Sequence, residues 1–261
     1  MTTLSPTEWN VLLTRPAHQC GELKRLFEKY NATVFIQPTI EILPPDDWQN
    51  IDLAIHSVSR CDILVFASSN GVSAFFDRAK FLFSEKFEIY TQNLPKILAT
   101  GPGTAETLAG YGVTDVQIPN KTYDAEGIVE LFASQDIADK KVMIVRGNRG
   151  RDVLPDELLR LGADVRQVTV YRSIDVTEPS QEIASLVQCG KIHWVTVTSS
   201  AIGRSLVRMF GEALRQTKLA SISHITSQAL CECGFPPAVE ASEATMPALV
   251  DAVVGSVFKK R

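Results

Sequence analysis

Short apolar runs alternate with segments of helical spacing along the whole chain. The first run, residues 11–13, precedes residues 17–30, in which leucine and phenylalanine recur at helical intervals. Similar runs of strand length follow at residues 32–37, 62–66, 96–99, 141–145, 165–170, 193–197 and 220–225. Short strands that are apolar on both sides and separated by helices are typical of parallel sheets covered by helices. The pattern therefore predicts an α/β fold.

The chain also contains an internal repeat. Arg15 and Arg146 lie 131 residues apart in similar segments, and residues 31–34 match residues 162–165 at the same offset, as residues 65–69 match residues 196–200. A further match has an offset of 122 residues and pairs Thr104, Leu108 and Gly112 with Thr226, Leu230 and Gly234. We predict that one α/β unit is used twice. The repeat alone suggests two contiguous halves that meet near Gln135.

Small polar residues follow most of the predicted strands. Open α/β sheets bind ligands at the carboxyl ends of their strands, where helix N-termini present backbone N–H groups. Helix capping favours the same residue types, so any single turn is equally consistent with a purely structural role. Several such turns on matching edges of two sheets favour a binding rim. Its candidates are Thr14, Arg15, Ser68, Ser69, Asn70, Thr100, Gly101, Thr104, Arg146, Gly147, Thr198, Ser199, Ser200 and Thr226.

Composition limits the classes of function. A length of 261 residues suits two domains, and a formal net charge of −4 argues against nucleic acid as a partner. An anionic ligand would need a locally positive site. We expect no membrane partner, because no apolar run approaches the length that spans a bilayer. Five scattered cysteines and the lack of an evident signal peptide predict a cytoplasmic protein. Cys231 and Cys233 form a C-x-C that suits helix packing better than a metal site, so we predict no metal.

Several familiar motifs are incomplete. The turn at residues 101–103 lacks the third glycine of a dinucleotide fingerprint, because position 106 is Glu. The turn from Arg146 to Arg151 lacks the Lys-Ser/Thr of a phosphate-binding loop, although its arginines and glycines suit carboxylates or phosphates. The same turn could equally be a solvated loop. His193 and His224 fall within predicted strands, and no Gly-x-Ser-x-Gly supports a hydrolase triad.

Six segments follow one another along the chain: Val11-Leu12-Leu13-Thr14-Arg15-Pro16, Phe66-Ala67-Ser68-Ser69-Asn70-Gly71-Val72, Thr100-Gly101-Pro102-Gly103-Thr104-Ala105, Arg146-Gly147, Val170-Tyr171-Arg172 and Thr198-Ser199-Ser200. This ordered set resembles the uroporphyrinogen-III synthase family over nearly the whole chain. No single motif is specific, and their order carries the resemblance. Ala67 is a departure, since threonine is common there in the family.

The resemblance implies a particular fold: two similar flavodoxin-like domains with parallel sheets, joined by a two-stranded linker, with the active-site cleft between them. It replaces two contiguous halves by a crossover of the chain. Residues 1–38 and 175–261 would form a discontinuous domain 1, and residues 46–167 would form domain 2. Residues 39–45 and 168–174 would be the linker strands.

The resemblance also implies an activity: cyclisation of hydroxymethylbilane to uroporphyrinogen III, with loss of water and inversion of the last pyrrole ring. It implies a lyase that needs no cofactor. It allows a transient hand-over of hydroxymethylbilane from the preceding enzyme of the pathway. Tyr171 is the candidate for assisting departure of the hydroxyl group, or else a hinge-packing residue. Arg15, Arg146 and Arg151 are candidate partners of substrate carboxylates.

Two other functions stay open at this point. A non-catalytic two-domain module that binds an anionic metabolite or tetrapyrrole would use the same hinge and rims. A sugar-phosphate enzyme would require a dedicated base or metal site, and the sequence offers none.

Overall fold

The computed structural model describes residues 9–120, 122–132 and 136–258. Contacts within the chain divide it into two units. The central unit is the contiguous segment Ile42–Ser173, and the terminal unit combines the chain up to Glu41 with the chain from Ile174 onward. Gln135, near which two contiguous halves would have met, lies outside the described residues. Both boundaries between the units fall within strands, β3 (Ile40–Leu43) and β8 (Asp164–Asp175), which are neighbours in one sheet.

The terminal unit contains a five-stranded sheet in the order β11-β10-β9-β1-β2. All the pairings within it are parallel. Its strands are β1 (Trp9–Leu13), β2 (Ala32–Ile36), β9 (Trp194–Val197), β10 (Lys218–Ser221) and β11 (Val239–Glu240). Its helices are α1 (Gly21–Glu28), α8 (Gln181–Gln188), α9 (Ser200–Phe210), α10 (His224–Glu232) and α11 (Met246–Phe258), with 3₁₀ turns at Ala17–Gln19 and Gly211–Gln216.

The central unit contains a six-stranded sheet in the order β3-β8-β7-β4-β5-β6. The remaining strands are β4 (Ile63–Phe66), β5 (Lys96–Ala99), β6 (Val116–Gln117) and β7 (Lys141–Gly147). The helices are α2 (Gln49–Ser57), α3 (Ser69–Phe83), α4 (Phe87–Gln92), α5 (Pro102–Ala109), α6 (Ala125–Phe132) and α7 (Val153–Arg160), with 3₁₀ turns at Val58–Arg60 and Ser84–Lys86. The predicted α/β class with parallel sheets is confirmed.

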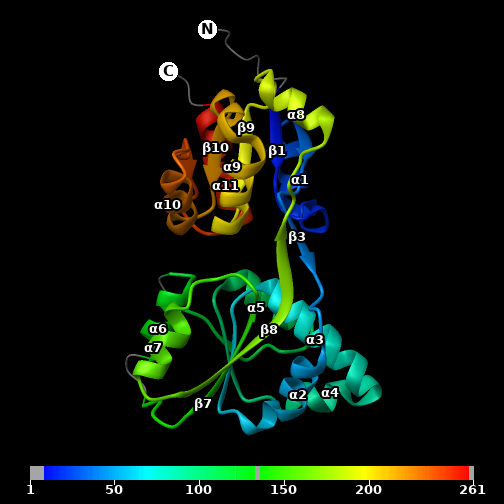
Figure 1. Ribbon diagram of the computed structural model, residues 1–261, viewed down its shortest axis with the longest axis vertical. Coiled ribbons are helices and arrows are strands. Elements are labelled where there is room, and N and C mark those ends of the chain that lie inside the picture. Colours follow the sequence, from blue (N-terminus) through cyan, green and yellow to red (C-terminus); the bar gives the residue numbers. More distant parts are fainter. Residues whose placement is uncertain (1–8, 121, 133–135, 259–261) are drawn as a thin grey trace. The chain divides into compact units, whose positions relative to one another are not determined.

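Side chains of the central sheet alternate between two apolar layers. Leu64 and Phe66 of β4 face a cluster built with α2, α3 and α5, whereas Ile63 and Val65 face a second cluster built with α6 and α7. Figure 1 shows α6 and α7 side by side on their face of the sheet. All four β4 side chains are buried, which explains why this strand is an uninterrupted apolar run.

The two units share one strand register. Val11 pairs with Trp194 between β1 and β9, and residues 131 positions away, Val142 and Ile63, pair between β7 and β4. The pairings of β9 with β10 and of β4 with β5 match in the same way. Gly234 and Gly112, which match at the offset of 122 residues, have positive φ angles of 82° and 83° after α10 and α5. The two units therefore repeat the same structure. Matching strands occur in a different order along the chain, so the central unit is a circular permutant of the terminal unit.

The structure corrects the strand predicted at residues 220–225. β10 ends at Ser221, and Ser223 instead caps α10 by accepting a hydrogen bond from the backbone N–H of Thr226. His224 therefore begins a helix and does not lie in a strand. His193 lies one residue before β9, where its Nδ1 accepts a hydrogen bond from the backbone N–H of Asn10 over 2.8 Å. In the described residues we find no helix long and apolar enough to cross a membrane.

Candidate functional site

The switch point of each sheet lies between two strands whose connections leave in opposite directions. It lies between β1 and β9 in the terminal unit and between β7 and β4 in the central unit. Ligands of open α/β sheets bind at such points, outside the carboxyl ends of the strands. In the central unit this edge carries a hollow of about 230 Å³. Its lining includes six of the predicted site residues: Ser68, Thr100, Arg146, Gly147, Arg151 and Tyr171.

Two hydroxyl groups meet in this hollow. The Oγ of Ser68, after β4, lies 3.2 Å from the phenolic oxygen of Tyr171 on β8. The same Oγ accepts a hydrogen bond of 3.1 Å from the backbone N–H of Gly71 and so caps α3. Because that N–H fills an acceptor site on Ser68, the serine hydroxyl hydrogen is available to point at Tyr171. The helix N-terminus, Ser68 and Tyr171 can thus form one polarised chain of donors.

Gly147 makes room for the Tyr171 ring. The pairing of β7 with β8 shifts between Arg146 and Gly147, and this bulge sets Gly147 opposite Tyr171. A Cβ atom on Gly147 would lie 2.5 Å from the Cζ of Tyr171, so a side chain cannot fit without displacing the ring. Bulges of this kind re-aim side chains near functional sites. Asn148 also stabilises the position of β8, since its Oδ1 accepts a hydrogen bond of 2.8 Å from the backbone N–H of Ser173.

Two of the arginines that line this hollow are held by carboxylates. The Nη1 of Arg146 donates to Asp152 Oδ1 over 2.7 Å and to Gln167 Oε1 over 2.8 Å. Arg151 forms a two-pronged ion pair with Glu126. That pair raises the pKa of Arg151 and lowers the pKa of Glu126, in both cases chiefly through the hydrogen bonds between the two side chains. Both groups stay charged at neutral pH.

The rim of the terminal unit repeats two hydrogen bonds of the central rim. Ser199 Oγ caps α9 by accepting from the backbone N–H of Ile202, as Ser68 does in α3. Ser200 Oγ donates to the carbonyl of Ile225, and Ser69 Oγ donates to the carbonyl of Gly103. These serines therefore serve as structural caps and braces. Thr198, Thr100 and Asn70 are half-buried beside them.

Arg15 differs from its counterpart Arg146. Its Nη2 donates to Gln19 Oε1 over 3.1 Å and its Nη1 lies 3.6 Å from the sulfur of Met246. In the described chain no carboxylate lies within ion-pair distance of Arg15, and its buried Nε has no hydrogen-bond partner. Burial lowers the pKa of Arg15. A half-buried guanidinium with spare donors is suited to binding a carboxylate.

Three predicted rim residues lie in the cores instead. The exposed fractions of Thr14, Thr104 and Thr226 are 0%, 6% and 2%. The Thr14 hydroxyl donates to the carbonyl of Thr196, and the Thr226 hydroxyl lies 3.2 Å from Ser223 Oγ. Thr104 and Thr226 fall within the first turns of α5 and α10, facing inward. The hydroxyls of Thr14 and Thr226 are therefore engaged within the protein, and substrate binding by these three residues stays a prediction. Gly101 is buried too, under Tyr123.

The start of α6 and the two residues before it were not predicted from the sequence as part of the site. Tyr123, Asp124 and Ala125 line the hollow, and Asp124 Oδ1 caps α6 by accepting a hydrogen bond of 2.8 Å from the N–H of Gly127. The closeness of Tyr123 to Gly101 gives that glycine its role, because a Cβ there would lie 2.9 Å from the Cβ of Tyr123. The available signal was the Asp124 cap, which marks a helix start in the sequence.

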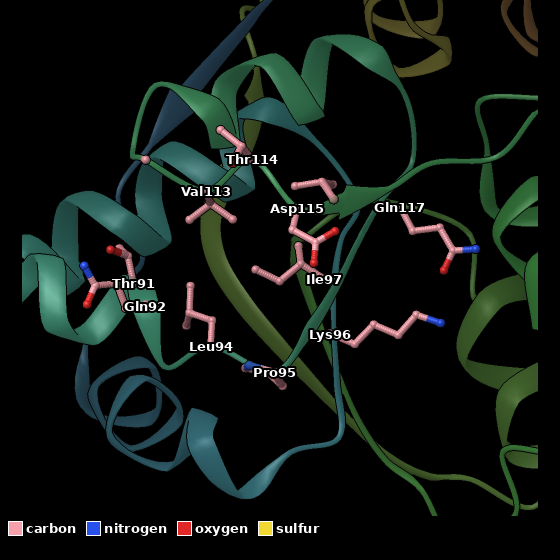
Figure 2. Close-up of a pocket in the computed structure, with 12 residues that line it drawn as sticks. Thr91, Gln92, Leu94, Pro95, Lys96, Ile97, Val113, Thr114, Asp115 and Gln117 are labelled. Carbon is pink, nitrogen blue, oxygen red and sulfur yellow. The ribbon is translucent and has the colours of Figure 1, made fainter.

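A larger hollow of about 820 Å³ lies at the opposite edge of the same sheet. It is lined by the start of β5 with the segment before it, and by the turn that leads into β6. Figure 2 shows Leu94 and Val113 on the side of α4, with Lys96 and Gln117 pointing away from them. The amino ends of parallel strands are not where such sheets bind ligands, and this hollow contains none of the predicted site residues. The smaller hollow is therefore the better candidate.

Metal chemistry finds little support in these side chains. In residues 9–120, 122–132 and 136–258, no three His, Cys, Asp or Glu side chains gather as a metal site would require. The five cysteines are free, and Cys231 and Cys233 lie at the end of α10. The hollow of the central unit offers hydroxyls, guanidinium groups and backbone N–H donors, which together suit an anionic organic ligand.

Comparison with known proteins decides the family. The family model described as uroporphyrinogen-III synthase HemD matches residues 21–251. The chain belongs to the uroporphyrinogen-III synthase family. The uroporphyrinogen-III synthase of Synechococcus elongatus is 27% identical over 252 residues, 93% of each chain. That of Chlorobaculum parvum is 26% identical over 228 residues, which covers 86% of this chain and 89% of the relative.

Solved structures of the same family share the fold. A uroporphyrinogen III synthase of Thermus thermophilus superimposes with a TM-score of 0.66 at 16% identity, over 97% of this chain and 100% of that one. The enzyme of Helicobacter pylori gives a TM-score of 0.59 at 17% identity, over 95% of this chain and 99% of that one. At these identities the likeness supports the two-domain α/β architecture of the family.

Proposed function

We propose that the protein converts hydroxymethylbilane to uroporphyrinogen III, acting as a cyclising lyase. Membership of the uroporphyrinogen-III synthase family supports the reaction. The hydroxyl pair of Ser68 and Tyr171 in the hollow of the central unit is the structural observation that carries it. The reaction removes one water and transfers no electrons, so it requires no redox cofactor.

In the proposed first step, the substrate hydroxyl leaves as water and a reactive azafulvene remains. Tyr171 donates a hydrogen bond to the departing oxygen, while Ser68 donates to the phenolic oxygen of Tyr171. The backbone N–H of Gly71, at the start of α3, in turn donates to Ser68. Each bond in such a chain strengthens the next, so the phenol becomes a better donor than it would be alone.

In the proposed second step, the substituted carbon of the last pyrrole ring attacks the azafulvene carbon and forms a spiro intermediate. This intermediate fragments and recloses with the ring inverted. The protein must hold a flexible octacarboxylate in a bent geometry, so that attack at the hindered carbon outruns direct closure. We assign this holding to backbone N–H donors of the rims and to Arg15, Arg146 and Arg151, acting on carboxylates.

We also propose that the protein works in the cytoplasm, where its five free cysteines would stay reduced. A transient hand-over from the enzyme that makes hydroxymethylbilane fits a substrate that closes spontaneously to the wrong isomer.

The deciding experiment is isomer analysis of the product after freshly made hydroxymethylbilane is supplied to the purified protein. We expect isomer III, without added metal or cofactor. Isomer I alone, formed at the rate of a protein-free control, would refute the proposed activity. Binding of a tetrapyrrole without turnover would instead support a non-catalytic binding module.

A further inference from the structure

The ion pair between Glu126 and Arg151 joins two segments that line the hollow of the central unit. Arg151 lies in the segment between β7 and α7, and Glu126 lies in the first turn of α6. Their two hydrogen bonds run side by side, and the one from Nη2 to Oε2 is 2.7 Å long. The three residues before Glu126 also line the hollow.

This geometry occupies one of the two edges through which Arg151 can bind a carboxylate with two parallel N–H donors. Glu126 accepts hydrogen bonds from Nη1 and Nη2, the donors at the end of the guanidinium, and does not use the edge that contains Nε. A substrate carboxylate can reach the same donors only by displacing Glu126.

The displacement is energetically easy at this position. The side chains of Arg151 and Glu126 are 50% and 44% exposed, so water can solvate each group as the pair opens. Arg146 is different, because its side chain is only 12% exposed and it holds Asp152 and Gln167 at once. Of these two arginines, Arg151 is thus the exchangeable cation and Arg146 is the fixed one.

We propose that Glu126 is an internal competitor of the substrate: its carboxylate occupies Arg151 until a substrate carboxylate replaces it. The inference rests on the proposed function, because it assumes a ligand with carboxylates. Glu126 then sets the affinity for that ligand without touching the reacting atoms. The low pKa of Glu126 keeps the competitor ionised at neutral pH.

The test is Glu126→Gln, which keeps the shape of the side chain and removes its charge. An exposed ion pair is worth up to about 1 kcal/mol, so KM should fall by about two- to fivefold while kcat stays unchanged. Arg151→Gln should raise KM. The double variant should match Arg151→Gln, because without the arginine nothing remains to compete for.

Glu232→Gln is the matched control. Glu232 pairs with Arg204 between α10 and α9, with side chains 48% and 46% exposed, and the change removes the same formal charge. It should leave KM unchanged. If it lowers KM equally, the effect is one of net charge and the proposal fails. A KM that rises in Glu126→Gln would mean that Glu126 positions Arg151, and an unchanged KM would mean a structural pair; either result overturns the proposal.

A binding measurement separates this inference from the proposed activity. Benzenehexacarboxylate, a polycarboxylate that is not a tetrapyrrole, can be titrated calorimetrically into the wild type and Glu126→Gln. If the variant binds the polycarboxylate more tightly but the protein forms no isomer III, the competitor role of Glu126 is supported and the proposed activity is rejected. If the wild type and the variant bind the polycarboxylate equally and the protein does form isomer III, only the competitor role of Glu126 is rejected.

Discussion

Arg15 of the terminal unit and Arg146 of the central unit follow matching strands, β1 and β7, in sheets of identical register. Their surroundings differ. Arg146 is neutralised by Asp152, whereas Arg15 is half-buried without a carboxylate partner in the described chain. The hydroxyl pair shows the opposite asymmetry. Tyr171 and Ser68 both belong to the central unit, and the position that matches Tyr171 in the repeat is Ile40.

The comparison indicates that duplication conserved the scaffold and redistributed the roles. The serine caps, the sheet register and the positive-φ glycines are kept in both units. These features stabilise the fold of each unit. The groups that differ between the units are the ones that would contact a ligand. The terminal unit has a cation without a carboxylate partner among the described residues, and the central unit has paired cations and the hydroxyl pair of Ser68 and Tyr171.

The largest effect is expected at Gly147, whose matching position in the terminal unit is Pro16. In Gly147→Ala the new Cβ would meet the Tyr171 ring at 2.5 Å, so the ring must move. We expect a loss of about 1–3 kcal/mol in the free energy of unfolding, together with a loss of activity at least as large as that of removing the Tyr171 hydroxyl. Urea unfolding and isomer III formation measure the two effects.

Gly103→Ala is the control for this change, since nothing lies within 4 Å of a Cβ there and Gly103 lies inside α5. It should be neutral or slightly stabilising. Unchanged activity in Gly147→Ala would show that the position of the Tyr171 ring does not matter.

The next effect concerns the hydroxyl that the terminal unit lacks. Tyr171→Phe should lower kcat by a factor of roughly 10 to 100, because one donor among many is lost. The free energy of unfolding should change by less than about 1 kcal/mol, since the ring remains. Ser68→Ala and Ser199→Ala should cost less activity, and each should lose about 1 kcal/mol of stability as a removed helix cap.

Steady-state kinetics and thermal melting distinguish these outcomes. If Tyr171→Phe leaves both kcat and Tm unaltered, the tyrosine serves only in the packing of β8. If Ser199→Ala lowers kcat as much as Tyr171→Phe does, the two rims contribute equally and the asymmetry between the units is wrong.

A smaller effect should separate the two arginines. Arg15→Gln should lower kcat/KM by about tenfold, the value of one charge-assisted hydrogen bond, with stability unchanged or raised because a poorly solvated charge is removed. Arg146→Gln should instead lower stability, since it leaves Asp152 without its partner. Both free energies come from urea unfolding. A loss of stability in Arg15→Gln with full activity would make Arg15 a structural residue.

The smallest effect is the acid dependence that Asp52 contributes, which should be confined to the central unit. The hydrogen bonds from Arg78 hold the pKa of Asp52 below its usual value. A lowered carboxyl pKa contributes stability above the unfolded value of about 3.9, and this contribution is lost as the pH falls through the folded value. Wild type should therefore lose up to about 1 kcal/mol below pH 4 relative to Asp52→Asn.

Hydrogen exchange over residues 42–173 and over the terminal unit can locate that loss. The position that matches Arg78 in the terminal unit is Met209, so the terminal unit should show no such difference between the variants. An equal difference between wild type and Asp52→Asn in both units would contradict this assignment.

Much of the fold could be predicted from the sequence because its signals are dense. The apolar run at β4 and the matched segments around Arg15 and Arg146 are local features of the sequence. Hydrophobic periodicity and a constant offset along the chain therefore reveal them. β6 and β11 escaped prediction because each has only two residues. The end of β10 was misplaced because Ile222 and Ile225 continue an apolar pattern past the Ser223 cap.

The site was harder to predict, since it depends on side-chain direction. Thr14 and Thr104 belong to the right turns but point into the cores, and no pattern of residue types distinguishes an inward hydroxyl from an outward one. The pairing of Arg151 with Glu126 joins residues 25 positions apart, and the place of Tyr123 depends on a loop that packs on Gly101. Such contacts arise only from the folded arrangement.

The central unit divides the terminal unit in sequence, and this sets the order in which a ribosome can finish the two units. β1 and β2 are synthesised first, but β9, the other neighbour of β1, begins only at Trp194. At about 5–20 residues per second, β1 and β2 wait for roughly ten to thirty seconds with one edge of β1 open, while the contiguous central unit emerges whole. The nascent chain therefore carries an incomplete sheet ahead of a complete one, and exposed strand edges are where chaperones and misassembly compete.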